Sequence, residues 1–131
     1  MILADTSAWI EFDRATESPV DRRLAELIEA EGPLAVTEPV VMEVVAGARD
    51  DARERDLRRL LGRCTLLTFD SATDFDGAAR IYRTCRRQGI TPRGMVDCMI
   101  VAVARRSGAS LLCADRDLVQ IATVFDVPLD R

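Results

Sequence analysis

Apolar residues along the chain fall into two patterns, short continuous runs and longer stretches with helical spacing. The short runs predict strands at residues 1–4, 34–36, 64–69 and 110–114, and a fifth, edge strand is expected at 125–129. The runs do not alternate with polar residues. We therefore expect strands buried on both faces, as in a parallel sheet between helix layers.

The stretches between these runs repeat apolar residues every three or four positions, which is the spacing of one helix face. Helices are predicted between Ser18 and Gly32, Thr37 and Gly47, Ala48 and Arg63, Ser71 and Gly89, Met95 and Gly108, and after Asp115. Residues 71–74 match a capping box that would start the fourth of these. The order β-α-β-α-α-β-α-α-β-α-β predicts an α/β fold, a three-layer sandwich with a short, mostly parallel sheet of four to five strands. Ligands of such sheets bind beyond the carboxyl ends of the strands.

Composition narrows the chemistry that the chain can perform. The 131 residues carry 22 acidic and 18 basic side chains, a net charge of −4 and 48% hydrophobic residues, as expected of one soluble domain spanning residues 1–131. Every basic residue is Arg, and the chain contains neither His nor Lys. This excludes Ser/His/Asp and Cys/His catalysis, imidazole-bound metals, Schiff bases and the phosphate-binding lysine of P-loops. Any catalysis must use carboxylates, thiols, hydroxyls, Arg or an oxygen-bound metal.

The cysteines and the N-terminal segment indicate the compartment. Cys64, Cys85, Cys98 and Cys113 are far apart and form no CxxC pair, which argues against zinc-ribbon and thioredoxin-like sites. We expect reduced, buried thiols. No hydrophobic region of signal-peptide length precedes the first acidic residue, and no run approaches the ~18 apolar residues of a membrane span. A cytoplasmic protein without membrane contact is expected.

Four carboxylates stand at unusual positions. Asp5 and Asp115 each follow a predicted strand, so parallel pairing would bring both to one edge of the sheet. Glu43 and Asp97 lie within otherwise apolar helical stretches, where an unpaired charge is costly. Clustered carboxylates stay ionised together only around a cation, and an all-oxygen site suits Mg²⁺ or Mn²⁺.

Each of these acids also has an ordinary explanation. Asp5 could end its strand in a plain turn, and Asp115 or Asp117 could cap a helix. The two acids within helices could lie at an amphipathic edge and pair with Arg93. The four together are harder to explain in this way, because two of them would share one end of the sheet.

Four segments carry a family pattern across the whole chain: residues 2–10 (ILADTSAWI), 37–49 (TEPVVMEVVAGAR), 97–104 (DCMIVAVA) and 114–118 (ADRDL). Together they resemble the PIN domain, and more narrowly the VapC toxins of type II toxin–antitoxin pairs. Each motif alone is weak, but the set is specific. The resemblance implies a PIN-like fold and a metal-dependent endoribonuclease, with Mg²⁺ as cofactor and Mn²⁺ as its substitute.

The resemblance also assigns residues by their position in the motifs. The catalytic acids are Asp5, Glu43, Asp97 and Asp115, and the metal ligands are Asp5, Asp97 and Asp115, with Asp117 as a secondary ligand. Thr6 or Ser7 matches a small polar residue that helps to orient the metal or its water. Cys113 replaces a frequent hydroxyl residue and Leu118 a common Phe, which leaves the roles of the last two acids open.

An enzyme of this class needs local positive charge to bind RNA. Residues 80–93 hold five Arg and no acid, a local charge of +5. Arg80, Arg83 and Arg87 fall on one helical face and, with Arg93, are candidate RNA-binding residues. Because Arg replaces Lys throughout the chain, the same stretch could be an ordinary solvated face. Hydrolysis by a metal-activated water should leave a 5′-phosphate and a 3′-hydroxyl.

The resemblance further implies partners: an RNA substrate such as tRNA or another structured RNA, a VapB-type antitoxin that covers the acidic site, and a second copy in a homodimer. Two other enzyme or signalling classes with a parallel α/β sheet are excluded because the chain lacks one residue that each requires. A receiver domain needs a Lys, and a haloacid-dehalogenase-like phosphatase needs Asp where Ser7 stands. The non-enzymatic alternative is a catalytically silent PIN-like interaction module.

Overall fold

Four parallel strands lie at the centre of the computed structural model, which describes residues 1–130. They are β1 (Ile2–Ala4), β2 (Leu34–Val36), β3 (Thr65–Leu66) and β4 (Ser110–Leu112), in the order β3-β2-β1-β4. Leu3 in β1 lies opposite Ala35 in β2 and Leu111 in β4. The chain adds β2 and β3 on one side of β1 and then returns to its other side for β4. The strand order therefore reverses between β1 and β4, where ligands of parallel sheets bind.

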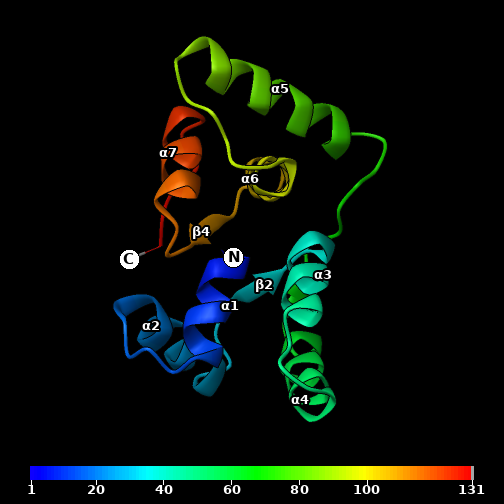
Figure 1. Ribbon diagram of the computed structural model, residues 1–131, viewed down its shortest axis with the longest axis vertical. Helices are drawn as coiled ribbons and strands as arrows, with labels where there is room; N and C mark the ends of the chain where they lie inside the picture. The colour runs from blue at the N-terminus through cyan, green and yellow to red at the C-terminus, as the bar shows by residue number, and fades with distance from the viewer. Residues whose placement is uncertain (131) are drawn as a thin grey trace.

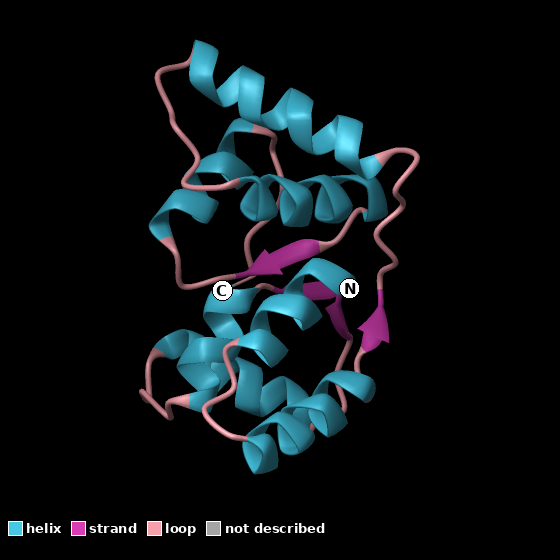
Figure 2. Ribbon diagram, turned by 45° about the vertical axis from the view of Figure 1, so that its right-hand side comes forward, coloured by secondary structure: helices cyan, strands magenta, loops and turns pink. Residues whose placement is uncertain are grey.

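Within residues 1–130, seven helices cover this sheet. They are α1 (Thr6–Asp13), α2 (Pro19–Glu29), α3 (Glu38–Ala46), α4 (Asp51–Gly62), α5 (Asp74–Arg87), α6 (Met95–Ser107) and α7 (Arg116–Val124). Figures 1 and 2 show α5, α6 and α7 together on one side of the sheet, α1 and α2 on the other, and α3 and α4 beside β2. The predicted three-layer α/β architecture is confirmed.

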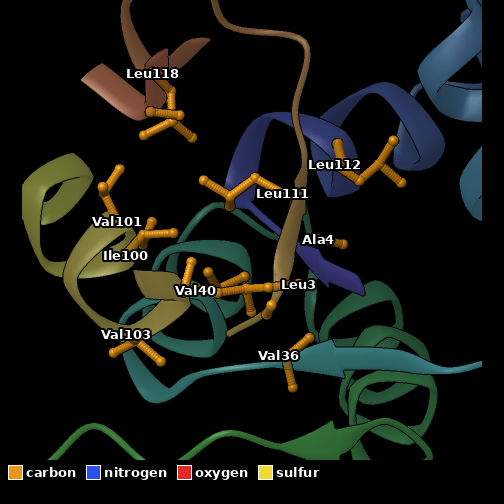
Figure 3. Close-up of a cluster of buried hydrophobic side chains, with 14 of the residues drawn as sticks. Leu3, Ala4, Val36, Val40, Ile100, Val101, Val103, Leu111, Leu112 and Leu118 are labelled. Carbon is orange, nitrogen blue, oxygen red and sulfur yellow. The ribbon is translucent and has the colours of Figure 1, made fainter. Parts of the chain in front are cut away.

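The core lies between the sheet and the helices. Leu3 of β1 and Leu111 of the neighbouring strand β4 are fully buried. Figure 3 shows them beside Ile100 and Val101 of α6, with Leu118 of α7 closing the cluster. Each such side chain stabilises the fold by roughly 1.5–3 kcal/mol when fully buried. Strands β1 and β4 are thus packed into the core, as their apolar sequences predict.

Three strand predictions differ from the structure, and the strand predicted at 110–114 ends at Leu112. The segment predicted as a buried strand at 64–69 pairs only over Thr65 and Leu66, and both residues are exposed because β3 lies at the edge of the sheet. Residues 125–129 form a single bridge, from Leu129 to Leu111, rather than a fifth strand.

Two helix starts also differ from the prediction. Helix α1 was missed, because Ala8 and Trp9 are its buried residues while Ile10 is 40% exposed, a pattern too short to indicate a helix face. The capping box at 71–74 does not form. Helix α5 begins at Asp74, and the side chain of its N-cap residue Thr73 makes no capping hydrogen bond.

The thiols follow the expectation of burial. Cys85 and Cys98 are fully buried and Cys64 is partly buried. Burial raises the pKa of Cys64 and of Cys98 to about 11, which makes both poor nucleophiles at neutral pH. Among residues 1–130, no helix is both long and apolar enough to cross a membrane.

Candidate active site

The pairing of β1 with β4 brings the first and last acidic motifs together. Beyond the two strands, the backbone N–H of Asp5 donates to the carbonyl of Leu112 at 3.0 Å and extends the ladder by one residue. Asp5 therefore lies beside the loop that leads from β4 to Asp115. Both acids stand at the carboxyl end of the sheet, next to the point where the strand order reverses.

Asp5 is a buried carboxylate, with 2% of its surface exposed. It is the N-cap of α1: its side chain accepts hydrogen bonds from the N–H of Ala8 at 3.3 Å and from the hydroxyl of Ser7 at 2.7 Å. Burial raises the pKa of Asp5 to about 6; the hydrogen bonds from Ser7 and Ala8 oppose this shift and the charge of Asp97 adds to it. No Arg within residues 1–130 forms an ion pair with Asp5. Its ionised form therefore gains from an added cation.

The two hydroxyl residues after Asp5 position the acids. Ser7 Oγ donates to Asp5 and accepts the N–H of Ala114 at 2.8 Å, which ties the end of β1 to the loop after β4. Thr6 Oγ1 donates to Glu43 Oε1 at 2.6 Å, which ties α1 to α3. The expected role of Thr6 or Ser7 in orienting a metal thus takes the form of orienting its candidate ligands.

Asp97 lies in the first turn of α6, whose N-cap Gly94 makes no side-chain capping bond. Burial raises the pKa of Asp97, Arg93 lowers it, and the charges of Glu43 and Asp117 raise it. The charges of Glu43 in α3 and Asp117 in α7 therefore act on Asp97, and the charge of Asp97 acts on Asp5, the residue after β1. Carboxylates from four separate parts of the fold act on one another electrostatically here.

The last two acids share one Arg. Asp115 is the N-cap of α7 and accepts the N–H of Asp117 at 2.9 Å, so the capping explanation for Asp115 is correct. Arg93 forms ion pairs with Asp115 through Nη2 and with Asp117 through Nε, the latter at 2.8 Å. Arg93 does not form the ion pair with Glu43 or Asp97 that the ordinary explanation proposed; its ion pairs are with Asp115 and Asp117, and only its charge acts on Asp97.

The donor chemistry of this site fits a hard divalent cation. Its side chains offer carboxylate and hydroxyl oxygens, with neither imidazole nor thiolate among the positioned groups. As the side chains stand, no three His, Cys, Asp or Glu residues within 1–130 form a group that could hold a metal ion. Of the ligands expected from the sequence, Asp5 and Asp97 have no ion pair among residues 1–130, whereas Asp115 and the secondary candidate Asp117 are both bound to Arg93.

The four candidate RNA-binding residues differ in their partners. Arg80 pairs with Asp76 at 3.1 Å, and Arg93 with the acidic site. Among the four candidates, Arg83 and Arg87 have no ion pair with any residue of the described chain. They line a shallow depression with Tyr82 and Arg86, whose guanidinium lies 6.0 Å from the centre of the Tyr82 ring. The i, i+4 spacing of Tyr82 and Arg86 is the signal that could have added them.

The comparisons with known proteins agree with one another. The PIN domain family model matches residues 2–124. The chain is 43% identical over 128 residues to VapC ribonuclease Mb1587 of Mycobacterium bovis and to ribonuclease VapC11 of Mycobacterium tuberculosis, covering 97% of this chain and 96% of each relative. The fold is similar to a chain in the crystal structure of VapBC2 from Rickettsia felis bound to a promoter DNA fragment, with a TM-score of 0.77, 16% identity and coverage of 99% and 98%.

Proposed function

The chain belongs to the PIN-domain family, and from this membership and the site we propose that it is the endoribonuclease toxin of a type II toxin–antitoxin pair. It hydrolyses RNA phosphodiester bonds at the acidic edge of its sheet. One observation carries the site assignment: burial raises the pKa of Asp5 to about 6, with the charge of Asp97 adding to the shift, and burial together with the charges of Glu43 and Asp117 raises the pKa of Asp97. Acids crowded in this way are arranged for a cation rather than for structural stability.

The activity of such a ribonuclease depends on a divalent metal, and we propose Mg²⁺, with Mn²⁺ as its substitute. The oxygen-only donor set and the absence of His from the chain support this choice. When bound, the ion supplies Lewis-acid chemistry: it makes a water a stronger nucleophile at neutral pH and offsets negative charge on phosphate oxygens. Hydrolysis by water leaves a 5′-phosphate and a 3′-hydroxyl.

The chain's own residues then have separate tasks. Asp5 and Asp97 are the proposed principal ligands, because they are the acids whose pKa values burial raises. Glu43 is held by the Thr6 hydroxyl at 2.6 Å, a position from which its other oxygen remains available to ligate or to accept a proton. Asp115 is the proposed third ligand and Asp117 the secondary one. Asp115 is fixed in place as the N-cap of α7, and its side chain is only 15% exposed, whereas that of Asp117 is 42% exposed.

The proposed partners are an RNA substrate, of which tRNA or another structured RNA is one class, a VapB-type antitoxin and a second copy of the chain in a homodimer. The fold shared with a chain of a VapBC2 complex supports the antitoxin. An RNA substrate implies action in the cytoplasm. The continuous core from β1 to Val127 supports the proposal that residues 1–131 form one PIN domain.

The test compares the wild-type chain with Asp97→Asn, using Asp76→Asn as a control that removes an exposed acid of α5. Each chain is expressed, and new 5′-phosphate RNA ends are sequenced. We expect Asp97→Asn to lower cleavage by about a hundredfold or more, and Asp76→Asn to cleave as the wild type does. Equal cleavage by all three chains would refute the site. Absence of cleavage by the wild type would favour the silent interaction module.

A further inference from the structure

Arg93 is a cation that the chain itself supplies to its acidic site. It lies in the connection between α5 and α6, two residues before α6 begins. Its guanidinium uses two different nitrogens, Nη2 toward Asp115 and Nε toward Asp117. A planar guanidinium binds two carboxylates in this way, whereas a Lys ammonium acts as a point charge.

This contact divides the acids of the site into two sets. Asp115 and Asp117 share the single positive charge of Arg93, which leaves the three groups with one net negative charge. Asp5 and Glu43 have hydroxyl partners, Ser7 and Thr6, and within residues 1–130 neither forms an ion pair with an Arg. Asp97 lies between the two sets, because Arg93 lowers its pKa while Glu43 and Asp117 raise it.

A divalent cation and a guanidinium compete for the same oxygens. Both are positive, so they repel one another, and each needs the lone pairs of Asp115 and Asp117. The Arg93 side chain can move away from the two acids without opening a cavity in the core, because it is 65% exposed. Solvent screens the exposed guanidinium side of both ion pairs, so Arg93 can leave and return, although the Asp115 side chain is only 15% exposed.

We propose that Arg93 is a latch that competes with the divalent ion for Asp115 and Asp117 and is displaced when the ion binds there. This inference rests on the proposed function, since it assumes a metal at the same acids. In the metal-free chain the latch keeps two neighbouring carboxylates from repelling each other. Its release lets them join Asp97 and leaves a free guanidinium at the rim of the site, where an RNA phosphate would arrive.

Mn²⁺ binding measures the competition without any cleavage. The full chain is stripped with EDTA, dialysed and titrated with MnCl₂ by isothermal calorimetry, as wild type, Arg93→Ala and Arg116→Ala. Arg116 is the matched control, because it is exposed, lies between the same two acids and forms no ion pair among residues 1–130. We expect Arg93→Ala to bind Mn²⁺ about three- to tenfold more tightly than wild type, and Arg116→Ala to change the affinity less than about twofold.

The other outcomes overturn the inference. Equal affinity of wild type and Arg93→Ala would show that Arg93 does not compete, while leaving the metal site intact. Weaker binding by Arg93→Ala would make Arg93 a positioning residue for the ligands. If Arg93→Ala and Arg116→Ala both bound Mn²⁺ more tightly to the same extent, the effect would come from the loss of one positive charge near the site and not from the contacts of Arg93. If no chain binds Mn²⁺, the metal site of the proposed function fails, and the latch fails with it.

Thermal melting provides a second readout. In EDTA, Arg93→Ala should melt at a lower temperature than wild type, because Asp115 and Asp117 then face each other without a cation. Saturating Mn²⁺ should remove this difference. A deficit that persists in saturating Mn²⁺ would instead give Arg93 a plain structural role and overturn the latch.

Discussion

The hydroxyl of Ser7 donates a 2.7 Å hydrogen bond to Oδ1 of Asp5. The hydroxyl oxygen of Ser7 in turn accepts the backbone N–H of Ala114 at 2.8 Å. One small side chain therefore holds the carboxylate after β1 and the loop that carries Asp115 after β4. The relative position of the first and last acids depends on this bridge as well as on the strand ladder.

Replacement of Ser7 by Ala should impair the site more than the fold. The variant loses one donor to Asp5 and leaves the Ala114 N–H without its acceptor, which should cost about 1–2 kcal/mol of unfolding free energy. Because Ser7 orients a candidate ligand, cleavage should fall by about 10- to 100-fold at a temperature where the variant is folded. Urea unfolding and an RNA cleavage assay measure the two effects.

Ser18→Ala is the matched control, since the Ser18 hydroxyl caps α2 by accepting the N–H of Asp21 at 3.1 Å, away from the acids. It should lose about 1 kcal/mol of stability and keep its cleavage rate. If both serine variants retained full cleavage, the bridge would have no part in the activity.

The stability of the metal-free chain should depend on the ionisation of Asp5. Its folded pKa of about 6 lies above the ordinary 3.8, so the folded state binds the proton more tightly than the unfolded state. The free energy of unfolding should therefore fall as the pH rises from about 4 to about 6 and level off above that, a loss of up to about 3 kcal/mol. Urea unfolding in EDTA across this range measures it.

Asp5→Asn tests the assignment of this pH dependence. The variant should lose most of the fall in unfolding free energy between pH 4 and 6. Asp97, whose pKa burial also raises, accounts for the remaining fall. Asp74 acts with the opposite sign and below this range, because its hydrogen bonds to Arg106 lower its pKa. An unchanged slope in Asp5→Asn would place the titrating group elsewhere.

The ion pair of Arg106 with Asp74 should support the fold and not the chemistry. Arg106 binds both carboxylate oxygens of Asp74, at 2.9 and 2.7 Å, and also the carbonyl of Thr68 at 2.8 Å. Asp74 is 2% exposed, so Arg106→Gln leaves a buried charge unpaired and should lower the unfolding free energy by about 2–4 kcal/mol. Urea unfolding measures the loss.

Arg105→Gln is the neighbouring control, because Arg105 is exposed and its guanidinium lies over the Phe125 ring at 5.2 Å. It should cost less than about 1 kcal/mol. Similar losses in the two variants would mean that Asp74 does not depend on its buried partner.

The unpaired arginines of α5 should bind RNA. In an Asp97→Asn background, Arg83→Glu with Arg87→Glu should weaken RNA binding by about tenfold and reduce the slope of log K against log salt by about 1–2. Filter binding at several salt concentrations measures both. A double variant at Arg22 and Arg55, which are also exposed and outside ion pairs among residues 1–130, is the charge-matched control. If the two double variants bind RNA with the same affinity and salt dependence, the arginines of α5 have no special part in RNA binding.

The sequence predicted the architecture well, because the apolar pattern of strands and helices is a local signal. Apolar runs such as residues 34–36 cannot be exposed, so they indicated the central strands directly. Where the local signal was weak or shared, the prediction was wrong. The motif Asp5-Thr6-Ser7 suited a turn as well as a helix cap, and α1 was missed; Asp74 suited a capping box, although its side chain is bound by Arg106 from another helix.

The sequence by itself determined that this chain forms a parallel α/β sheet, that its chemistry rests on carboxylates, and which carboxylates are out of place. Only the tertiary structure decided how those charges are balanced. Arg93 lies four residues from Asp97 in sequence, yet it pairs with Asp115, 22 positions away. Hydrophobic burial is encoded in composition and spacing, whereas the partner of a charge depends on which loop ends meet after the strands have paired.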